Sequence, residues 1–172
     1  MSYILMLNGP VCAGKSSLSR NILKNSTGVY VASFDSIKKN VSRYTDELYG
    51  DFVLELFYIS VEKALDQGLS IVVEPKQKKL REYREFFSKQ AKDRGYKLYE
   101  INIEASKETM LSRLEKRVSE GKSVNVHTPE HHLARYKLYL ENKREDVLTY
   151  NTDNLSEVEL YEKVVHDFKL QA

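Results

Sequence analysis

The 172-residue sequence contains no tryptophan, one cysteine, three prolines and seven glycines. A single cysteine, Cys12, excludes an internal disulfide framework and a metal site built from several cysteines. No apolar run is long enough to cross a membrane, and Asn8 interrupts the N-terminal one, so we expect no membrane span, no secretory signal and a cytoplasmic location. The 27 basic and 25 acidic residues give a net charge of only +2, which disfavours nucleic acid and anionic membranes as partners.

The length predicts one domain over residues 1–172, and the apolar content of 41% is typical of a soluble globular enzyme. Short apolar runs alternate with segments of helical periodicity. The expected strands cover 3–7, 29–32, 69–74, 96–103 and 147–150, and the expected helices cover 17–23, 36–44, 51–67, 78–94, 106–118, 129–142 and 156–168. This alternation predicts an α/β fold with a parallel five-stranded sheet between helices, and ligands at the carboxyl ends of the strands.

A complete G-x-x-x-x-G-K-[ST] phosphate loop lies between the first expected strand and helix. Gly9 and Gly14 allow backbone N–H groups to approach a polyphosphate, Lys15 can reach the β- and γ-phosphates, and Ser16 can bind Mg²⁺. This four-position pattern arises by chance in such a chain only about once in a hundred. The predicted nucleotide-binding residues are Gly9, Pro10, Val11, Cys12, Ala13, Gly14, Lys15, Ser16 and Ser17, together with Arg113.

Two acidic residues follow neighbouring strands. Asp35 can accept a proton from an attacking hydroxyl or help to bind Mg²⁺, although it is equally suited to cap a helix. Glu74 ends an apolar strand, as a Walker B acid does, and can bind the metal through water. An exit of the chain into solvent explains Glu74 equally well.

Residues 119–128 lack periodicity, which suits a mobile flap within a lid over about 117–135. Arg113 and Arg117 lie four residues apart at its base and Arg135 on its far side. Arginines that move with a lid stabilise the charge that develops during phosphoryl transfer, whereas a single exposed arginine is usually only solvated. Three histidines, at 127, 131 and 132, lack the further ligands that zinc requires.

An acceptor is expected between Asp35, the segment 36–67 and the lid. Its expected walls combine aromatic and basic side chains, which suits an acceptor with a flat or apolar part and anionic groups. The predicted substrate-binding residues are Asp35, Lys38, Arg43, Phe52, Glu74 and Arg135.

The sequence resembles the small P-loop kinases, a group that includes adenylate, shikimate and gluconate kinases. Residues 7–17 are similar to the L-N-G-x-x-x-A-G-K-S-S motif of the chloramphenicol phosphotransferase-like and zeta-toxin-like branch. Residues 34–37 resemble the aspartate motif of this branch, and residues 101–117 resemble the strand and the arginine-bearing helix that precede its lid. The resemblance implies a five-stranded P-loop NTPase fold with the phosphate-loop strand in the centre. It implies ATP and Mg²⁺ as cofactors, with phosphates and metal at Lys15 and Ser16, Asp35 as catalytic base, and Arg113 and Arg117 as lid arginines.

The sequence therefore predicts an ATP-dependent kinase that transfers the γ-phosphoryl group to a hydroxyl or phosphate of a small molecule, such as a nucleoside or nucleotide. One alternative is a nucleotide-binding switch or slow NTPase that acts on a protein partner. A 5′-hydroxyl polynucleotide kinase is a further alternative, which the nearly neutral charge disfavours.

Overall fold

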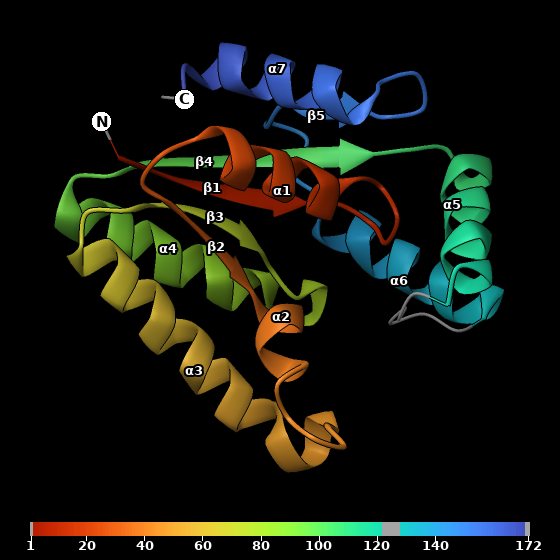
Figure 1. Cartoon of the computed structure of the whole chain (residues 1–172), viewed down its shortest axis with the longest axis horizontal. Helices are drawn as coiled ribbons and strands as arrows, with labels where there is room; N and C mark the ends of the chain where they lie inside the picture. The colour runs from red at the N-terminus through yellow and green to blue at the C-terminus, as the bar shows by residue number, and fades with distance from the viewer. Residues whose placement is uncertain (1, 122–127, 171–172) are drawn as a thin grey trace.

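The computed structural model describes residues 2–121 and 128–170, and its centre is a parallel sheet of five strands (Figure 1). The strands are β1 (Tyr3–Asn8), β2 (Val29–Ser33), β3 (Ser70–Glu74), β4 (Lys97–Glu104) and β5 (Thr149–Asn151). They are arranged in the order β2-β3-β1-β4-β5, and every pairing is parallel. The predicted sheet, with the phosphate-loop strand in its centre, is confirmed.

Helices cover both faces of this sheet. They are α1 (Lys15–Asn25), α2 (Phe34–Lys38), α3 (Asp46–Asp66), α4 (Leu80–Arg94), α5 (Lys107–Ser119), α6 (Pro129–Asn142) and α7 (Glu157–Phe168), with a 3-10 turn, η1 (Gln77–Lys79). Along β1, Leu5 and Leu7 pack in one apolar core with α1, α5 and α7, whereas Ile4 and Met6 pack in another with α3 and α4. Because successive side chains of a strand point to opposite faces of the sheet, β1 contributes residues to both cores.

The main local departure from the predicted elements lies between β2 and α3. A helix was expected over 36–44, but α2 ends at Lys38, and the next helix begins at Asp46 rather than near Asp51. The side chain of Thr45 accepts a hydrogen bond from the N–H of Leu48 and so caps α3. The predicted capping box at Ser156 is confirmed.

Helix α6 is fixed to the sheet through its C-terminal half. Tyr139 donates a hydrogen bond to Glu104 at the end of β4 (2.6 Å), and Lys143 forms an ion pair with the same carboxylate (3.1 Å). Arg84 of α4 donates to the carbonyl of Asn142 (2.9 Å). The described part of the predicted lid therefore includes a helix anchored at one end, and residues 122–127 of that lid lie outside the described residues.

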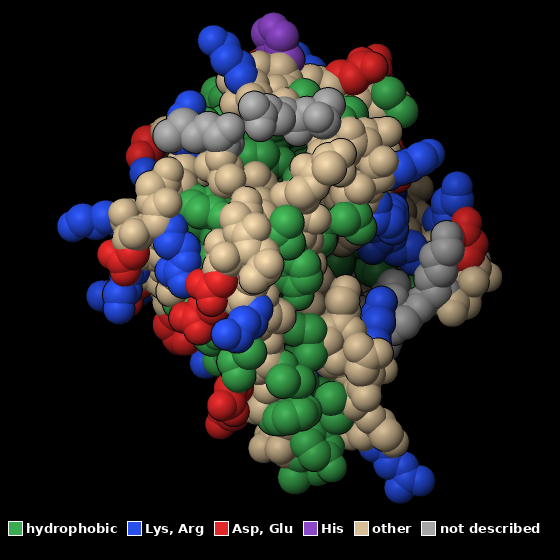
Figure 2. Space-filling view, turned by 60° about the vertical axis from the view of Figure 1, so that its left-hand side comes forward, with side chains coloured by type: hydrophobic (Ala, Val, Ile, Leu, Met, Phe, Trp, Pro, Cys, Tyr) green, Lys and Arg blue, Asp and Glu red, His purple; other side chains and the backbone are tan. Residues whose placement is uncertain are grey.

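An apolar surface lies at the lower end of the molecule, where Figure 1 places α2 and the start of α3. Figure 2 shows hydrophobic side chains gathered there, and Leu48 and Phe52 are 72% and 51% exposed. Across residues 2–121 and 128–170, no helix combines the length and apolar character needed to cross a membrane.

Candidate active site

The phosphate loop joins the end of β1 to the start of α1, as predicted. A Cβ on Gly9 would lie 2.2 Å from the carbonyl oxygen of Ile103, so this glycine is required by the close approach of the loop to β4. This packing against backbone adds a second reason for glycine to the expected close approach of a ligand. Gly14 has a φ of 114°, in the region that favours glycine, and it precedes the first residue of α1.

The N-terminus of α1 fits a phosphate. Gly14 offers no side-chain cap, so the first N–H groups of the helix are directed at the loop with the positive end of the helix dipole. Lys15 donates to the carbonyls of Gly9 (2.7 Å) and Pro10 (2.6 Å) within its own loop. Burial lowers the pKa of Lys15, and the nearby Glu74 carboxylate opposes this effect. A polyphosphate bound by this loop would place compensating negative charge next to the buried ammonium.

Glu74 is bound directly to the phosphate-loop helix. Ser16 donates to one of its carboxylate oxygens (2.8 Å) and Ser19 to the other (2.7 Å). Mg²⁺ prefers oxygen ligands and is commonly held by one or two carboxylates, water and substrate phosphates. The Ser16 hydroxyl and the Glu74 carboxylate fit that donor set, whereas the described residues form no ready-made cluster of three or more His, Cys, Asp or Glu side chains for a metal.

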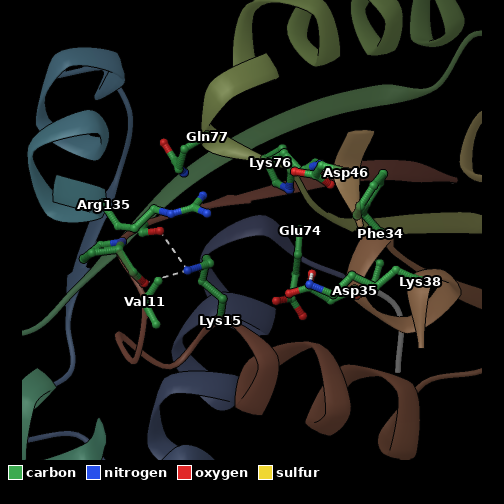
Figure 3. Close-up of a pocket in the computed structure, with 14 residues that line it drawn as sticks. Val11, Lys15, Phe34, Asp35, Lys38, Asp46, Glu74, Lys76, Gln77 and Arg135 are labelled. Carbon is green, nitrogen blue, oxygen red and sulfur yellow. Dashed lines mark hydrogen bonds and ion pairs between the residues drawn. The ribbon is translucent and has the colours of Figure 1, made fainter. Parts of the chain in front are cut away.

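A cavity opens beside the loop and brings the ends of three strands together (Figure 3). Its lining comprises Gly9, Pro10, Val11, Lys15, Ser33, Phe34, Asp35, Lys38, Asp46, Glu74, Pro75, Lys76, Gln77 and Arg135. Lys15 and Glu74 are central in the view, Arg135 reaches in from α6 on one side, and Asp35 and Lys38 lie on the other. The structure thus unites the phosphate-loop lysine with four of the six predicted substrate-binding residues, Asp35, Lys38, Glu74 and Arg135, whereas Arg43 and Phe52 are absent from the lining.

Ion pairs order the side of this cavity that lies opposite Arg135. Asp35 and Lys38 approach within 2.7 Å, and Asp46 and Lys76 within 3.0 Å. The ammonium of Lys76 also lies 3.8 Å from the centre of the Phe34 ring. Hydrogen bonds from Tyr44 and Lys76 lower the pKa of Asp46, which keeps this carboxylate charged at neutral pH.

The three predicted arginines occupy different surroundings. Arg113 donates to the carbonyl of Cys12 (3.2 Å) and to the hydroxyl (2.9 Å) and carbonyl (2.8 Å) of Thr152, so it ties α5 to the loop and to the end of β5. Arg117 lies close enough for its charge to oppose the burial-raised pKa of the Cys12 thiol, but it does not line the cavity. Of the three, only Arg135 lines it.

Several predicted residues lie away from the cavity. Arg43 and Phe52 are exposed and are not among its lining residues. Cys12 and Ala13 are buried residues of the loop itself, and Ser17 donates to Glu157 of α7 (2.6 Å). Of the three histidines, His131 is exposed, His132 is buried, and His127 lies outside the described residues.

The sequence reasoning missed the roles of Asp46, Lys76 and Gln77 in the cavity. Lys76 follows the end of β3, and the carboxyl ends of parallel strands are where ligands are expected, so the sequence did contain a signal for this residue. Asp46 could have been found from the Thr45-Asp46 pair, a helix start in a polar segment. Gln77 carries no local signal: it donates to Asn8 (2.7 Å), 69 positions away.

The comparisons with known proteins agree with this geometry. The AAA_33 family model (AAA domain) matches residues 4–142, whereas no curated protein matches the chain. Similar solved structures include the tunicamycin resistance protein of Deinococcus radiodurans (17% identity, TM-score 0.66, 99% of this chain and 98% of that chain). A sugar kinase from Janibacter sp. HTCC2649 is also similar, with 15% identity and a TM-score of 0.59 over 98% of this chain and 95% of that chain. The APS kinase CysC of Mycobacterium tuberculosis has 14% identity and a TM-score of 0.60 over 98% of both chains. At these identities the structures show the fold, which is the P-loop NTPase fold of kinases, and the match over residues 4–142 shows that the chain belongs to the AAA_33 family.

Proposed function

We propose that this protein is an ATP-dependent kinase that transfers the γ-phosphoryl group to a hydroxyl of a small molecule. One observation carries the proposal: the phosphate-loop Lys15 and the carboxylate-bearing Asp35, which follow different strands, line the same cavity. A site that only bound nucleotide would have no use for an acidic group across a cavity from the phosphates.

ATP with Mg²⁺ would supply the phosphoryl group, with the phosphates at the loop and the metal at Ser16 and Glu74. Lys15 and Arg135 bring positive charge to the end of the cavity nearest the loop, where the transferred group becomes more negative. Asp35 would accept the proton of the acceptor hydroxyl. Its ion pair with Lys38 at 2.7 Å holds the carboxylate at the edge of the cavity.

The proposal is tested by following ATP consumption and phosphorylated product across a panel of hydroxyl compounds that includes nucleosides, sugars and a 5′-hydroxyl oligonucleotide. We expect at least one small compound to stimulate turnover. In Asp35→Asn, kcat should fall by about 10²–10⁴-fold because the proton acceptor is removed, while ATP affinity is kept because the phosphate loop is unchanged. Asp51→Asn, at an exposed carboxylate of α3 outside the cavity, is the matched control.

Three results would contradict the proposal. Full acceptor-dependent turnover in Asp35→Asn would remove Asp35 from the role of base. Slow hydrolysis that no compound stimulates would favour a regulatory switch, and phosphorylation of the oligonucleotide alone would favour a polynucleotide kinase.

A further inference from the structure

The cavity is electrically divided into two halves. The phosphate half is formed by the loop, Glu74 and Arg135, and the acceptor half by Phe34, Asp35, Lys38, Asp46 and Lys76. The division follows the elements: the first group comes from β1, α1, β3 and α6, and the second from α2, the start of α3 and the segment after β3.

Every lysine of the acceptor half is paired with a carboxylate of the same half. Lys38 is paired with Asp35 (2.7 Å) and Lys76 with Asp46 (3.0 Å), and the two lysine side chains are only 21% and 25% exposed. Lys76 is additionally fixed over the Phe34 ring, and Asp46 accepts a hydrogen bond from Tyr44. Within the described residues that line this half, two positive and two negative groups therefore balance each other.

The phosphate half differs because, among the described residues, its cations form no ion pair with a carboxylate. Lys15 donates to backbone carbonyls, and Arg135 forms neither an ion pair nor a hydrogen bond with any other residue in 2–121 or 128–170. The Glu74 carboxylate is occupied by two serine hydroxyls. Positive charge that is available to an anion thus lies only at the end of the cavity where the phosphates of a nucleotide would bind.

We propose that the acceptor is an uncharged hydroxyl compound. This inference rests on the proposed function, and it departs from the sequence-based expectation of an acceptor with anionic groups. An anionic acceptor would meet Asp35 and Asp46 without an unpaired cation to compensate it, and like charges brought together in a binding site oppose binding. A cationic acceptor would meet Lys38 and Lys76 in the same way.

The test uses hydroxyl compounds in matched pairs that differ in charge: nucleosides with their 5′-monophosphates, hexoses with their 6-phosphates, and aromatic diols with their carboxylated counterparts. Binding is measured by calorimetry to the protein loaded with Mg²⁺ and AMPPNP. We expect the neutral member of a pair to bind at least about tenfold more tightly. Tighter binding of the charged members, or binding by none of the compounds, would overturn the inference.

A variant reverses the charge balance. Asp46→Asn leaves Lys76 without its carboxylate, so the preference within a pair should move toward the anionic member by about tenfold. Lys76→Gln leaves Asp46 unpaired and should instead improve binding of glucosamine relative to glucose, which gives a second readout if the first variant does not fold. Asp51→Asn should leave both ratios unchanged, and unchanged ratios in both cavity variants would contradict the inference.

These measurements separate the inference from the proposed function. If neutral compounds bind preferentially but no phosphoryl transfer to them is detected, the proposed kinase activity fails and the neutral character of the site stands. If phosphoryl transfer occurs to the charged members in preference, the kinase activity stands and the neutral acceptor is refuted.

Discussion

Arg113 provides the sharpest test of how the phosphate loop is held. The resemblance to P-loop kinases implies a lid arginine at this position, but in the structure its guanidinium donates to Cys12 and Thr152. The Thr152 hydroxyl donates in turn to the carbonyl of Ala13 (2.8 Å). We therefore expect Arg113→Ala to destabilise the fold and to weaken ATP binding, because both partners of the guanidinium contact the loop or belong to it.

The size of the effect follows from these contacts. Hydrogen bonds to charged groups contribute about 1.5–3 kcal/mol each and are not additive, so three bonds from one partly buried guanidinium should contribute about 3 kcal/mol in total. For a chain of this length that corresponds to a decrease in Tm of about 6–12 °C. In a double-mutant cycle with Thr152→Val, the coupling energy should be about 1.5 kcal/mol, since only the bond from Nη1 to Oγ1 (2.9 Å) is shared.

Urea unfolding followed by far-ultraviolet circular dichroism measures these free energies, and a fluorescent ATP analogue reports the affinity. Arg117→Ala is the matched control, because Arg117 lies one turn further along α5 and, within 2–121 and 128–170, has no hydrogen-bond or ion-pair partner. Its cost should stay within about 0.5 kcal/mol. If Arg113→Ala costs no more than this control, or if the coupling energy is below about 0.3 kcal/mol, Arg113 does not support the loop.

Three further predictions concern the loop and the proposed metal site. Gly9→Ala should lower the free energy of unfolding by about 2–4 kcal/mol in urea titrations, because the new Cβ would lie 2.2 Å from the Ile103 carbonyl oxygen. The control is Gly28→Ala, at a φ of 71° with open space around it, which should cost only about 1–2 kcal/mol. Equal costs for the two variants would contradict the steric argument. Glu74→Gln should raise the Mg²⁺ concentration that half-saturates turnover by about tenfold with little loss of stability, and an unchanged Mg²⁺ titration would exclude Glu74 from the metal site. Burial raises the pKa of Cys12, so iodoacetamide should alkylate this thiol slowly at pH 7. The alkylation rate of the folded protein should still rise with pH above the point at which the rate of the urea-unfolded chain has reached its plateau. Rapid alkylation of the folded protein at pH 7 would refute this prediction.

The sheet was predictable because its signals are local. Its central strands are continuous apolar runs, and the capping residues mark where the helices start. The beginning of α3 was missed for a physical reason. Leu48 and Phe52 in its first turns are exposed, so they do not form the apolar face toward the core that periodicity detects, and only the cap at Thr45 marks the start.

The candidate site likewise has one part that local sequence signals predict and another part that they do not. The phosphate loop is one continuous segment whose chemistry requires certain residue types at fixed spacing, and the sequence alone identified it. The spacing of Arg113 and Arg117 was equally visible, but it could not show that the partners of Arg113 lie 101 and 39 positions away. Such contacts depend on how α5 packs against the loop and β5, and no local pattern contains that information.

The charge on the proposed acceptor side illustrates how composition and tertiary pairing can point to different ligands. Lysines and an arginine in the segment after β2 indicated a site for an anionic group, since positive charge counted along a sequence has no partners. In the folded chain Asp46 comes from the start of a different helix and neutralises Lys76, while Arg43 is exposed outside the cavity. The charge that a ligand meets is a property of pairs, and pairs are formed by tertiary packing. The phosphate loop could therefore be predicted from a motif, whereas the charge balance of the facing cavity wall follows only from which carboxylate faces which ammonium.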